Sequence, residues 1–188
     1  NKIKRLKRMK ITQLEIKKIK SLASKKGRQS NQLFMAEGIR MLEEAITQKK
    51  LPNAIYYCNH YLSERGQSLV SKFSKKKLNS IEISAKQLDQ ISDSKSSQGI
   101  IAIFEIPQVN LSKLSIAECR NILVCENVSD PGNLGSLLRS ALAFEFGTVI
   151  LLGNTTDCFS PKVVRSSAGA IFGLKLVIID IDELKKMK

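Results

Sequence analysis

The stretch 121–147 limits the possible folds of this chain more than any other part of its sequence. It reads NILVCENVSDPGNLGSLLRSALAFEFG, and its uninterrupted apolar residues 122–125 predict a β-strand that is covered on both faces. The Asp-Pro-Gly sequence at 130–132 is typical of a tight turn. Asn133 follows as a good N-cap for a helix over 134–145. Strand, turn and helix in this order predict one unit of an α/β fold.

The predicted helix carries a candidate anion site near its first turn. Its apolar residues are spaced three and four positions apart, and they form one apolar stripe: Leu134, Leu137, Leu138, Ala141 and Leu142. Arg139 lies off this stripe. Because helical side chains lean toward the N-terminus, Arg139 can reach back over Gly135 and Ser136. A guanidinium, free N–H groups and the positive end of the helix dipole would then converge on one anion. A solvated surface arginine is the alternative interpretation.

Predicted strands and helices alternate along most of the remaining chain. A capping box formed by Thr12 and Glu15 predicts the start of the first helix, and 25–30 is expected to be a loop. A second helix is expected to include the apolar residues of 34–46. The other expected elements are strands 54–58, 78–83, 99–106, 121–126, 148–152 and 174–180, and helices 61–73, 85–91, 134–145 and 161–167. This alternation predicts the α/β fold class with largely parallel sheets.

The chain is expected to form two domains joined by a linker at 107–114, where Pro107 interrupts the periodicity. A basic arm over 1–11 precedes a small α/β domain over 12–106, and a parallel-sheet domain follows over 115–188. Three strands are few for a parallel sheet that is covered on both faces. The C-terminal domain is therefore expected to be incomplete.

The charge of the chain is concentrated at its N-terminus. The formal net charge is +14, and residues 1–28 hold twelve Lys or Arg against one acidic residue, Glu15. Such a basic block is typical of nucleic-acid binding, although a solvated tail that keeps the protein soluble is the alternative.

Five basic residues are candidate contacts for RNA phosphates. Lys25, Lys26 and Arg28 lie in the expected first loop. Lys162 and Arg165 flank the start of the helix that follows Pro161, where they could equally be surface charges.

The composition argues against a metal site and against a membrane span. The four cysteines, Cys58, Cys119, Cys125 and Cys158, form no CxxC pair, and His60 is the only histidine. No apolar run reaches the roughly 18 residues that cross a bilayer. The protein is expected to be cytoplasmic, with its cysteines reduced.

Four segments resemble a known family. The segment 129–135, SDPGNLG, together with Arg139, resembles the first motif of the SpoU (TrmH) family of RNA ribose 2′-O-methyltransferases. The segment 160–170, SPKVVRSSAGA, resembles a second stretch of that family. FMAEG at 34–38 with EEA at 43–45, and SQGIIA at 97–102, resemble the substrate-binding domain that the family carries at its N-terminus.

This resemblance implies a two-domain enzyme of the SPOUT class that uses S-adenosylmethionine to methylate a ribose 2′-OH in structured RNA, with rRNA as the favoured substrate. It also implies a homodimer and a catalytic domain that ends in a trefoil knot. By the same resemblance, Arg139 handles the target phosphate and activates the 2′-OH, and Asn133 lies in the active site.

The chain departs from the family in one respect, because the later G-x-E-x-x-G and S-L-N-V-S motifs are absent from its 188 residues. We therefore expect no knot and no complete cofactor site, and no cofactor-binding residue is assigned. A non-catalytic RNA-binding protein derived from this family is the alternative function. A phosphate- or nucleotide-binding α/β protein has less support, because neither a P-loop nor a GxGxxG motif occurs.

Overall fold

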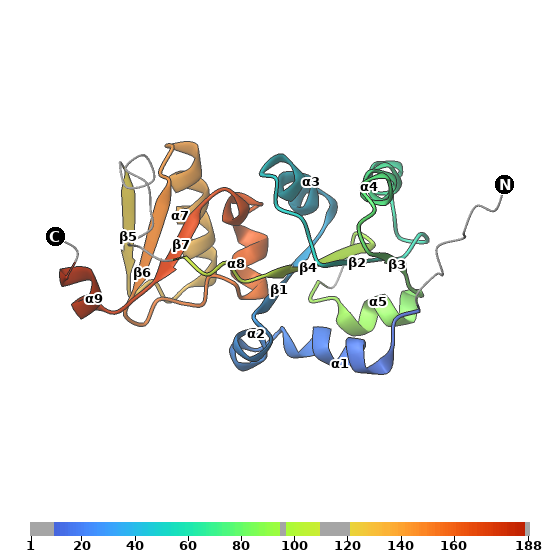
Figure 1. Cartoon of the computed structure of the whole chain (residues 1–188), viewed down its shortest axis with the longest axis horizontal. Coiled ribbons are helices and arrows are strands. Elements are labelled where there is room, and N and C mark those ends of the chain that lie inside the picture. The colour runs from blue at the N-terminus through green and yellow to red at the C-terminus, as the bar shows by residue number, and fades with distance from the viewer. Residues whose placement is uncertain (1–9, 95–96, 110–120, 187–188) are drawn as a thin grey trace.

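Two β-sheets organise the structure, one in each half of the chain (Figure 1). The computed structural model describes residues 10–94, 97–109 and 121–186. The N-terminal half contains α1 (Gln13–Ser21), α2 (Lys25–Asn31), β1 (Leu33–Glu37), α3 (Ile39–Thr47), β2 (Ala54–Tyr57), α4 (Glu64–Lys75), β3 (Ser80–Glu82), α5 (Ala85–Ile91) and β4 (Ile100–Glu105). The C-terminal half contains β5 (Ile122–Glu126), α7 (Pro131–Ala143), β6 (Thr148–Leu152), α8 (Pro161–Ser166), the 3-10 helix η2 (Ala170–Phe172), β7 (Lys175–Ile178) and α9 (Ile181–Lys185). The α/β fold class is confirmed.

The N-terminal sheet is mixed, with the strand order β1-β4-β2-β3. Strand β4 is the most apolar strand of this half and lies between β1 and β2, antiparallel to both. Only β2 and β3 are parallel. The expectation of a largely parallel sheet is therefore wrong for this half, because β4 inserts between two strands that follow each other in the chain.

Two elements near the N-terminus differ from the prediction. The expected loop over 25–30 is α2, which Ser24 caps by accepting a hydrogen bond from the backbone N–H of Gly27 at 3.0 Å. Phe34 belongs to β1 and not to a helix. Gly38 separates β1 from α3 with a φ of 105°, a conformation that a residue with a side chain rarely adopts. The predicted start of α1 is confirmed, because Thr12 and Glu15 form the capping box.

The C-terminal sheet is parallel, as expected, and its strand order is β5-β6-β7. Its central strand β6 is buried along its whole length. The edge strand β5 is not, and the side chain of Val124 is 45% exposed. The prediction that 122–125 is covered on both faces is therefore wrong, because an apolar run alone does not distinguish a central strand from an edge strand.

One hydrophobic core crosses from one half of the molecule to the other. The ring of Phe34 in β1 lies 5.0 Å from that of Phe159, measured between centroids, and Phe104 in β4 lies 4.7 Å from Phe172. Helices α8 and η2 lie between the two sheets and carry this contact (Figure 1). The two halves are thus held together by apolar packing. Residues 1–9 of the predicted arm and 110–114 of the predicted linker lie outside the described residues.

Candidate functional site

The first turn of α7 is capped by Asp130, whose backbone is extended. Its Oδ1 accepts a hydrogen bond from the backbone N–H of Asn133 at 2.8 Å. Pro131 occupies the first helical position, where its missing N–H costs no hydrogen bond. The prediction that Asn133 caps the helix is therefore wrong. It is the third residue of α7, and it is exposed.

Arg139 lies further along α7 and lines a pocket of about 600 Å³, which we call the Arg139 pocket. Ser136 and Ser140 line it from the same helix, Ala168 approaches from the segment after α8, and Glu44 belongs to α3 of the other half. The pocket combines a guanidinium with hydroxyl groups and one carboxylate. A guanidinium can donate two parallel hydrogen bonds to a phosphate, and hydroxyl groups can exchange hydrogen bonds with a ribose.

The structure does not bring Asn133 and Arg139 into one pocket. Six residues of α-helix separate them by about 9 Å along the axis and about 240° around it. Both side chains are exposed, and Asn133 lies outside the lining of the Arg139 pocket. A ligand that touches both residues must extend along the surface of α7, as a polynucleotide backbone can.

Helix α8 is held close against the start of α7. A Cβ atom added at Gly135 would lie 2.0 Å from Ser166 Oγ, so only glycine allows this approach. Ser166 Oγ is 2.8 Å from the carbonyl oxygen of Lys162 and 3.1 Å from that of Pro131. Ser166 of the SPKVVRSSAGA segment therefore serves the close packing of α8 against α7.

Lys162 and Arg165 are exposed on α8, and each faces an acidic side chain. Lys162 Nζ lies 4.0 Å from Asp130 Oδ2, and Arg165 Nη1 lies 2.9 Å from Asp93 Oδ2 in the N-terminal half. These exposed pairs contribute little to stability, and a phosphate can compete for the cations.

Two further hollows continue from the Arg139 pocket toward α4. The first, of about 310 Å³, shares Ala168 with the Arg139 pocket and is lined by Arg165 and Arg40. The second, of about 450 Å³, shares Arg40 with the first and adds Arg65. We call these three adjoining hollows the arginine path. It connects the C-terminal half with the N-terminal half.

Sequence analysis missed Arg40 and Arg65. Both occupy exposed positions on helices, and such arginines are too common to single out. Arg65 also forms a two-pronged ion pair with Glu43, and its Nε donates to Glu43 Oε1 at 2.9 Å. Hydrogen bonding to Arg65 holds the pKa of Glu43 below its ordinary value. Within the described part of the chain, Arg40 and Arg139 make no salt bridge, so they are the two path residues most available to an anion.

The candidate phosphate contacts near the N-terminus lie apart from the arginine path. Lys25 and Lys26 are exposed on α2. Arg28 is only 3% exposed, and its Nη2 lies 2.6 Å from Asp157 Oδ2 while its Nη1 donates to the carbonyl oxygen of Leu22 at 2.7 Å. Interpreting Arg28 as a phosphate contact is therefore wrong, because its donors are used inside the protein.

No metal centre is found among the described residues, where no three His, Cys, Asp or Glu side chains are grouped suitably. Cys58, Cys125 and Cys158 are buried free thiols, and burial raises the pKa of both Cys125 and Cys158. Cys119 lies outside the described residues. In the same part of the chain, no helix has the length and apolar character required to cross a membrane.

A cofactor of an α/β sheet usually binds beyond the carboxyl ends of its strands. The hollow found there is lined by Leu151, Gly153 and Ile178, and its volume is about 240 Å³. Small-molecule sites commonly measure about 300–1,000 Å³. The described residues therefore do not by themselves fit S-adenosylmethionine, and we assign none of them to it.

Two family models match the chain. The one described as the MRM3-like substrate binding domain matches residues 13–102, and the one described as the SpoU rRNA Methylase family matches residues 120–187. Each match coincides with one of the two sheets.

Curated relatives extend beyond the region that they share with this chain. The protein named rRNA methyltransferase 3A, mitochondrial, of Danio rerio is 34% identical over 81% of this chain and 35% of the relative. The 23S rRNA (guanosine(2553)-2'-O)-methyltransferase RlmP of Bacillus subtilis is 27% identical over 91% of this chain and 66% of the relative. The chain thus spans between 35% and 66% of the length of these relatives.

Solved structures share the fold. An AdoMet-bound rRNA methyltransferase from Sinorhizobium meliloti matches with a TM-score of 0.79 at 26% identity, over 95% of this chain and 67% of that chain. An RNA 2'-O ribose methyltransferase matches with a TM-score of 0.74 at 28% identity, over 94% and 67% of the two chains. Together with the motif around Arg139, these matches show that the chain belongs to the SpoU family and carries an MRM3-like substrate binding domain ahead of its SpoU domain.

Proposed function

We propose that this protein acts as an S-adenosylmethionine-dependent methyltransferase that modifies the ribose 2′-OH of a nucleotide in rRNA. The observation that carries the proposal is the position of Arg139, exposed in a pocket at one end of the arginine path. Relatives named as rRNA methyltransferases, and the AdoMet-bound structure, support the substrate and the methyl donor.

Arg139 would act on the nucleophile and on the adjacent phosphate. A ribose 2′-OH is a weak nucleophile that must lose its proton as it attacks. The Arg139 guanidinium can stabilise the alkoxide that develops, and it can bind the neighbouring phosphate. Asn133, at the start of the same helix, would orient the sugar–phosphate backbone further along α7. Accurate positioning of this kind supplies a large part of the rate of a transfer reaction. S-adenosylmethionine would supply the methyl group.

The rest of the RNA would follow the arginine path into the substrate-binding domain. Arg165, Arg40 and Arg65 would bind phosphates on this route, and Lys162, Lys25 and Lys26 would provide further contacts. We propose RNA-binding and methyltransferase domains over 12–106 and 115–188, joined at 107–114, and we propose a homodimer. Cytoplasmic location also stays a proposal, since some relatives are named as mitochondrial proteins.

The test measures transfer of a tritiated methyl group from S-adenosylmethionine to rRNA by the protein expressed from its own gene. A methylated 2′-OH protects the adjacent phosphodiester from alkali, so an alkaline ladder reveals the modified ribose. Arg139→Ala should lower kcat/KM by about 100-fold or more, because it removes a cation that stabilises developing charge.

Lys86→Ala is the matched control, since Lys86 is exposed on α5 and lines none of the hollows of the arginine path. Both variants should unfold at the wild-type temperature. Full activity of Arg139→Ala would remove Arg139 from the mechanism, and labelling of a base would contradict ribose methylation.

The second candidate is a non-catalytic RNA-binding protein. It would bind RNA along the arginine path without a methyl donor. Calorimetry with S-adenosylmethionine separates the two functions. Binding of both RNA and the donor supports the enzyme, whereas RNA binding without donor binding supports the alternative.

A further inference from the structure

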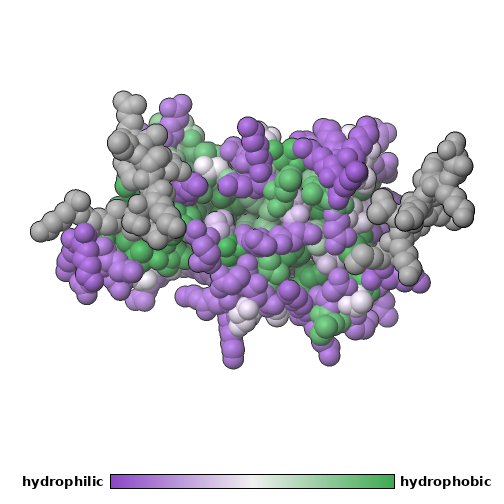
Figure 2. All heavy atoms as spheres, in the orientation of Figure 1, coloured by the Kyte–Doolittle hydropathy of each residue, from purple (hydrophilic) through white to green (hydrophobic). Residues whose placement is uncertain are grey.

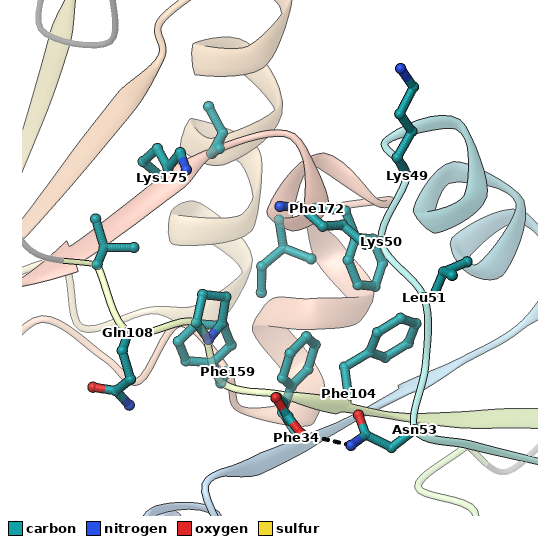
Figure 3. Close-up of a pocket in the computed structure, with 15 residues that line it drawn as sticks. Phe34, Lys49, Lys50, Leu51, Asn53, Phe104, Gln108, Phe159, Phe172 and Lys175 are labelled. Carbon is teal, nitrogen blue, oxygen red and sulfur yellow. Dashed lines mark hydrogen bonds between the residues drawn. The ribbon is translucent and has the colours of Figure 1, made fainter. Parts of the chain in front are cut away.

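A second large hollow lies at the junction of the two halves. Its volume is about 600 Å³, and it is bordered by β1 and β4 on one side and by η2 and the start of β7 on the other (Figure 3). Figure 2 shows hydrophobic atoms in a hollow near the middle of this face, with hydrophilic atoms around them. We call it the junction pocket. Nothing in the proposed reaction uses it.

The floor of the junction pocket is a packed cluster of phenylalanine rings. Phe34 stacks on Phe104 with a centroid distance of 5.6 Å, and the contacts of these two rings with Phe159 and Phe172 complete the cluster. Each ring is at most 5% exposed. The rings therefore pack mainly against one another, and they give the pocket a fixed apolar floor to which each ring contributes only a small exposed part.

The rim of the junction pocket is cationic. Lys49 and Lys50 extend from the turn after α3, and Lys175 begins β7 (Figure 3). Glu105 is the acidic lining residue, and its Oε1 accepts a hydrogen bond from Asn53 Nδ2 at 2.9 Å. Lys49 and Lys50 against one engaged carboxylate favour an anionic ligand.

Leu51 adds an apolar wall to this rim. It follows the two lysines, it lines the pocket, and its side chain is 52% exposed. A ligand for this site therefore needs a flat apolar part beside an anionic part.

The junction pocket and the Arg139 pocket lie on opposite sides of one thin wall. Ala170 of η2 lines the Arg139 pocket, while Phe172 of the same turn lines the junction pocket. Helix α3 contributes Glu44 to the first, and Lys49 after its end belongs to the second. Ala170 and Phe172 are two positions apart in this turn, so one short polynucleotide segment that passes around it can reach both pockets.

We propose that the junction pocket binds an unpaired nucleotide of the RNA close to the nucleotide in the Arg139 pocket. Its base lies against the phenylalanine floor and Leu51, and its phosphate lies between Lys49 and Lys50. The proposal rests on the proposed function, since it assumes an RNA substrate. The pocket offers an apolar surface to the base and cations to the backbone, and proteins bind single-stranded RNA through contacts of both kinds.

The test compares RNA binding by matched variants of the full chain. Lys49→Ala/Lys50→Ala removes two charges at the pocket. Lys76→Ala/Lys77→Ala removes two exposed charges at the end of α4, and the positive φ of Lys77, 57°, is close to that of Lys49, 55°. The probe is a fluorescent single-stranded octamer of uridylate, titrated at several salt concentrations. The pocket variant should lower the slope of log affinity against log salt by about 0.7, the contribution of the one phosphate on a single strand that the two lysines hold. The control should lower it less.

A second pair of variants tests the base. Leu51→Ser changes the apolar wall, and Leu14→Ser changes an equally apolar residue that is 78% exposed on α1. Leu51→Ser should weaken binding of the octamer about threefold or more, as expected for loss of part of a stacking surface, with an unchanged salt slope. Leu14→Ser should leave the affinity unchanged.

The outcomes separate this inference from the proposed function. If the octamer binds wild type and all four variants alike while Arg139→Ala abolishes methyl transfer, the junction pocket is not a nucleotide site and the proposed function stands. If both lysine variants weaken binding equally, only diffuse charge is involved and the inference fails. If the octamer and rRNA do not bind the unaltered chain, both proposals fail.

Discussion

Two arginines of this chain have opposite environments, and their roles differ accordingly. Arg28 is buried, and its guanidinium joins α2 to Asp157 in the loop before α8. The second carboxylate oxygen of Asp157 accepts from the backbone N–H of Phe159 at 2.8 Å. Arg139 is exposed and has no salt bridge among the described residues. The first arginine positions the two halves of the protein, and the second is available to a substrate.

Arg28→Ala should lower the free energy of unfolding by about 3 kcal/mol, because it leaves the largely buried Asp157 without its partner. Lys26→Ala on the same helix should change it by less than about 0.5 kcal/mol, since Lys26 is exposed. Urea denaturation measures both. Equal stabilities of the two variants would show that the ion pair contributes nothing.

The burial of Tyr56 can be tested by measuring how the free energy of unfolding depends on pH. The residue is 5% exposed, and burial raises its pKa from 10.0 to about 12, with a smaller contribution from Glu15. Between pH 10 and about 12 the unfolded chain releases the phenolic proton, whereas the folded chain keeps it. The stability that the neutral phenol contributes is therefore present below pH 10 and is lost as the pH rises toward about 12.

Tyr56→Phe removes the titrating hydroxyl. Between pH 10 and about 11, wild type should therefore lose about 1 kcal/mol more stability than the variant does. Urea midpoints at half-unit steps of pH measure the difference. Parallel curves for the two proteins would exclude a contribution from Tyr56, whatever the buried cysteines do, because those residues are common to both.

Whether the role of a residue can be predicted from the sequence depends on how far along the chain its partner lies. The N-cap of α7 depends on residues within three positions, and both Asp130 and Asn133 are residue types that cap helices. Arg28 is different, since its partner Asp157 is 129 positions away. No local pattern could predict that pairing, so a buried arginine was interpreted as a surface one.

At the scale of elements, the contact between α7 and α8 depends on one residue without a side chain. Gly135→Ala should destabilise the protein by about 2 kcal/mol, because overlap of the new methyl group with Ser166 outweighs the better helix propensity of alanine. Ser140→Ala in the same helix should be neutral or slightly stabilising. Thermal unfolding of the two variants measures the contrast.

A second substitution makes this prediction sharper. Gly135→Ala/Ser166→Gly should recover only part of the loss, because the backbone carbonyl carbon of Ser166 would also lie 2.8 Å from the added Cβ. Complete recovery would mean that the helices contact each other through side chains alone.

The elements that were predicted correctly have a clear local signal. The strands and helices of the C-terminal half were expected in their observed order, since turn residues and capping residues separate them. Strand β1 was missed because Phe34, Met35 and Ala36 are all buried and show no alternation. Strand direction in the N-terminal sheet was also missed, because β4 is placed by pairing with β1 and β2, which sequence periodicity does not report.

At the scale of the whole molecule, the arginine path predicts how RNA affinity depends on salt. Arg40→Ala should weaken rRNA binding and lower the slope of log affinity against log salt by about 0.7 to 0.9, the value for one phosphate contact. Lys86→Ala should leave the slope unchanged. Fluorescence anisotropy over a range of salt concentrations measures it, and an unchanged slope for Arg40→Ala would remove this residue from the RNA contact.

The overall organisation was predictable mainly because four short segments carry the family resemblance in the correct order. The resemblance could not reveal the arginine path or the junction pocket. Both are made by residues from the two halves, and their positions depend on how α3, α8 and η2 pack together. Sequence patterns describe each half separately, whereas the candidate binding surfaces arise where the halves meet.

The shared phenylalanine cluster has a consequence for how this architecture can be recombined. Phe34 and Phe104 belong to the substrate-binding half, and Phe159 and Phe172 belong to the SpoU half, yet they form one packed unit. A hybrid that joins the SpoU half to the substrate-binding half of another relative would place unmatched rings against each other. Exchange of RNA specificity by transferring this domain therefore requires the rings on both sides to be transferred together.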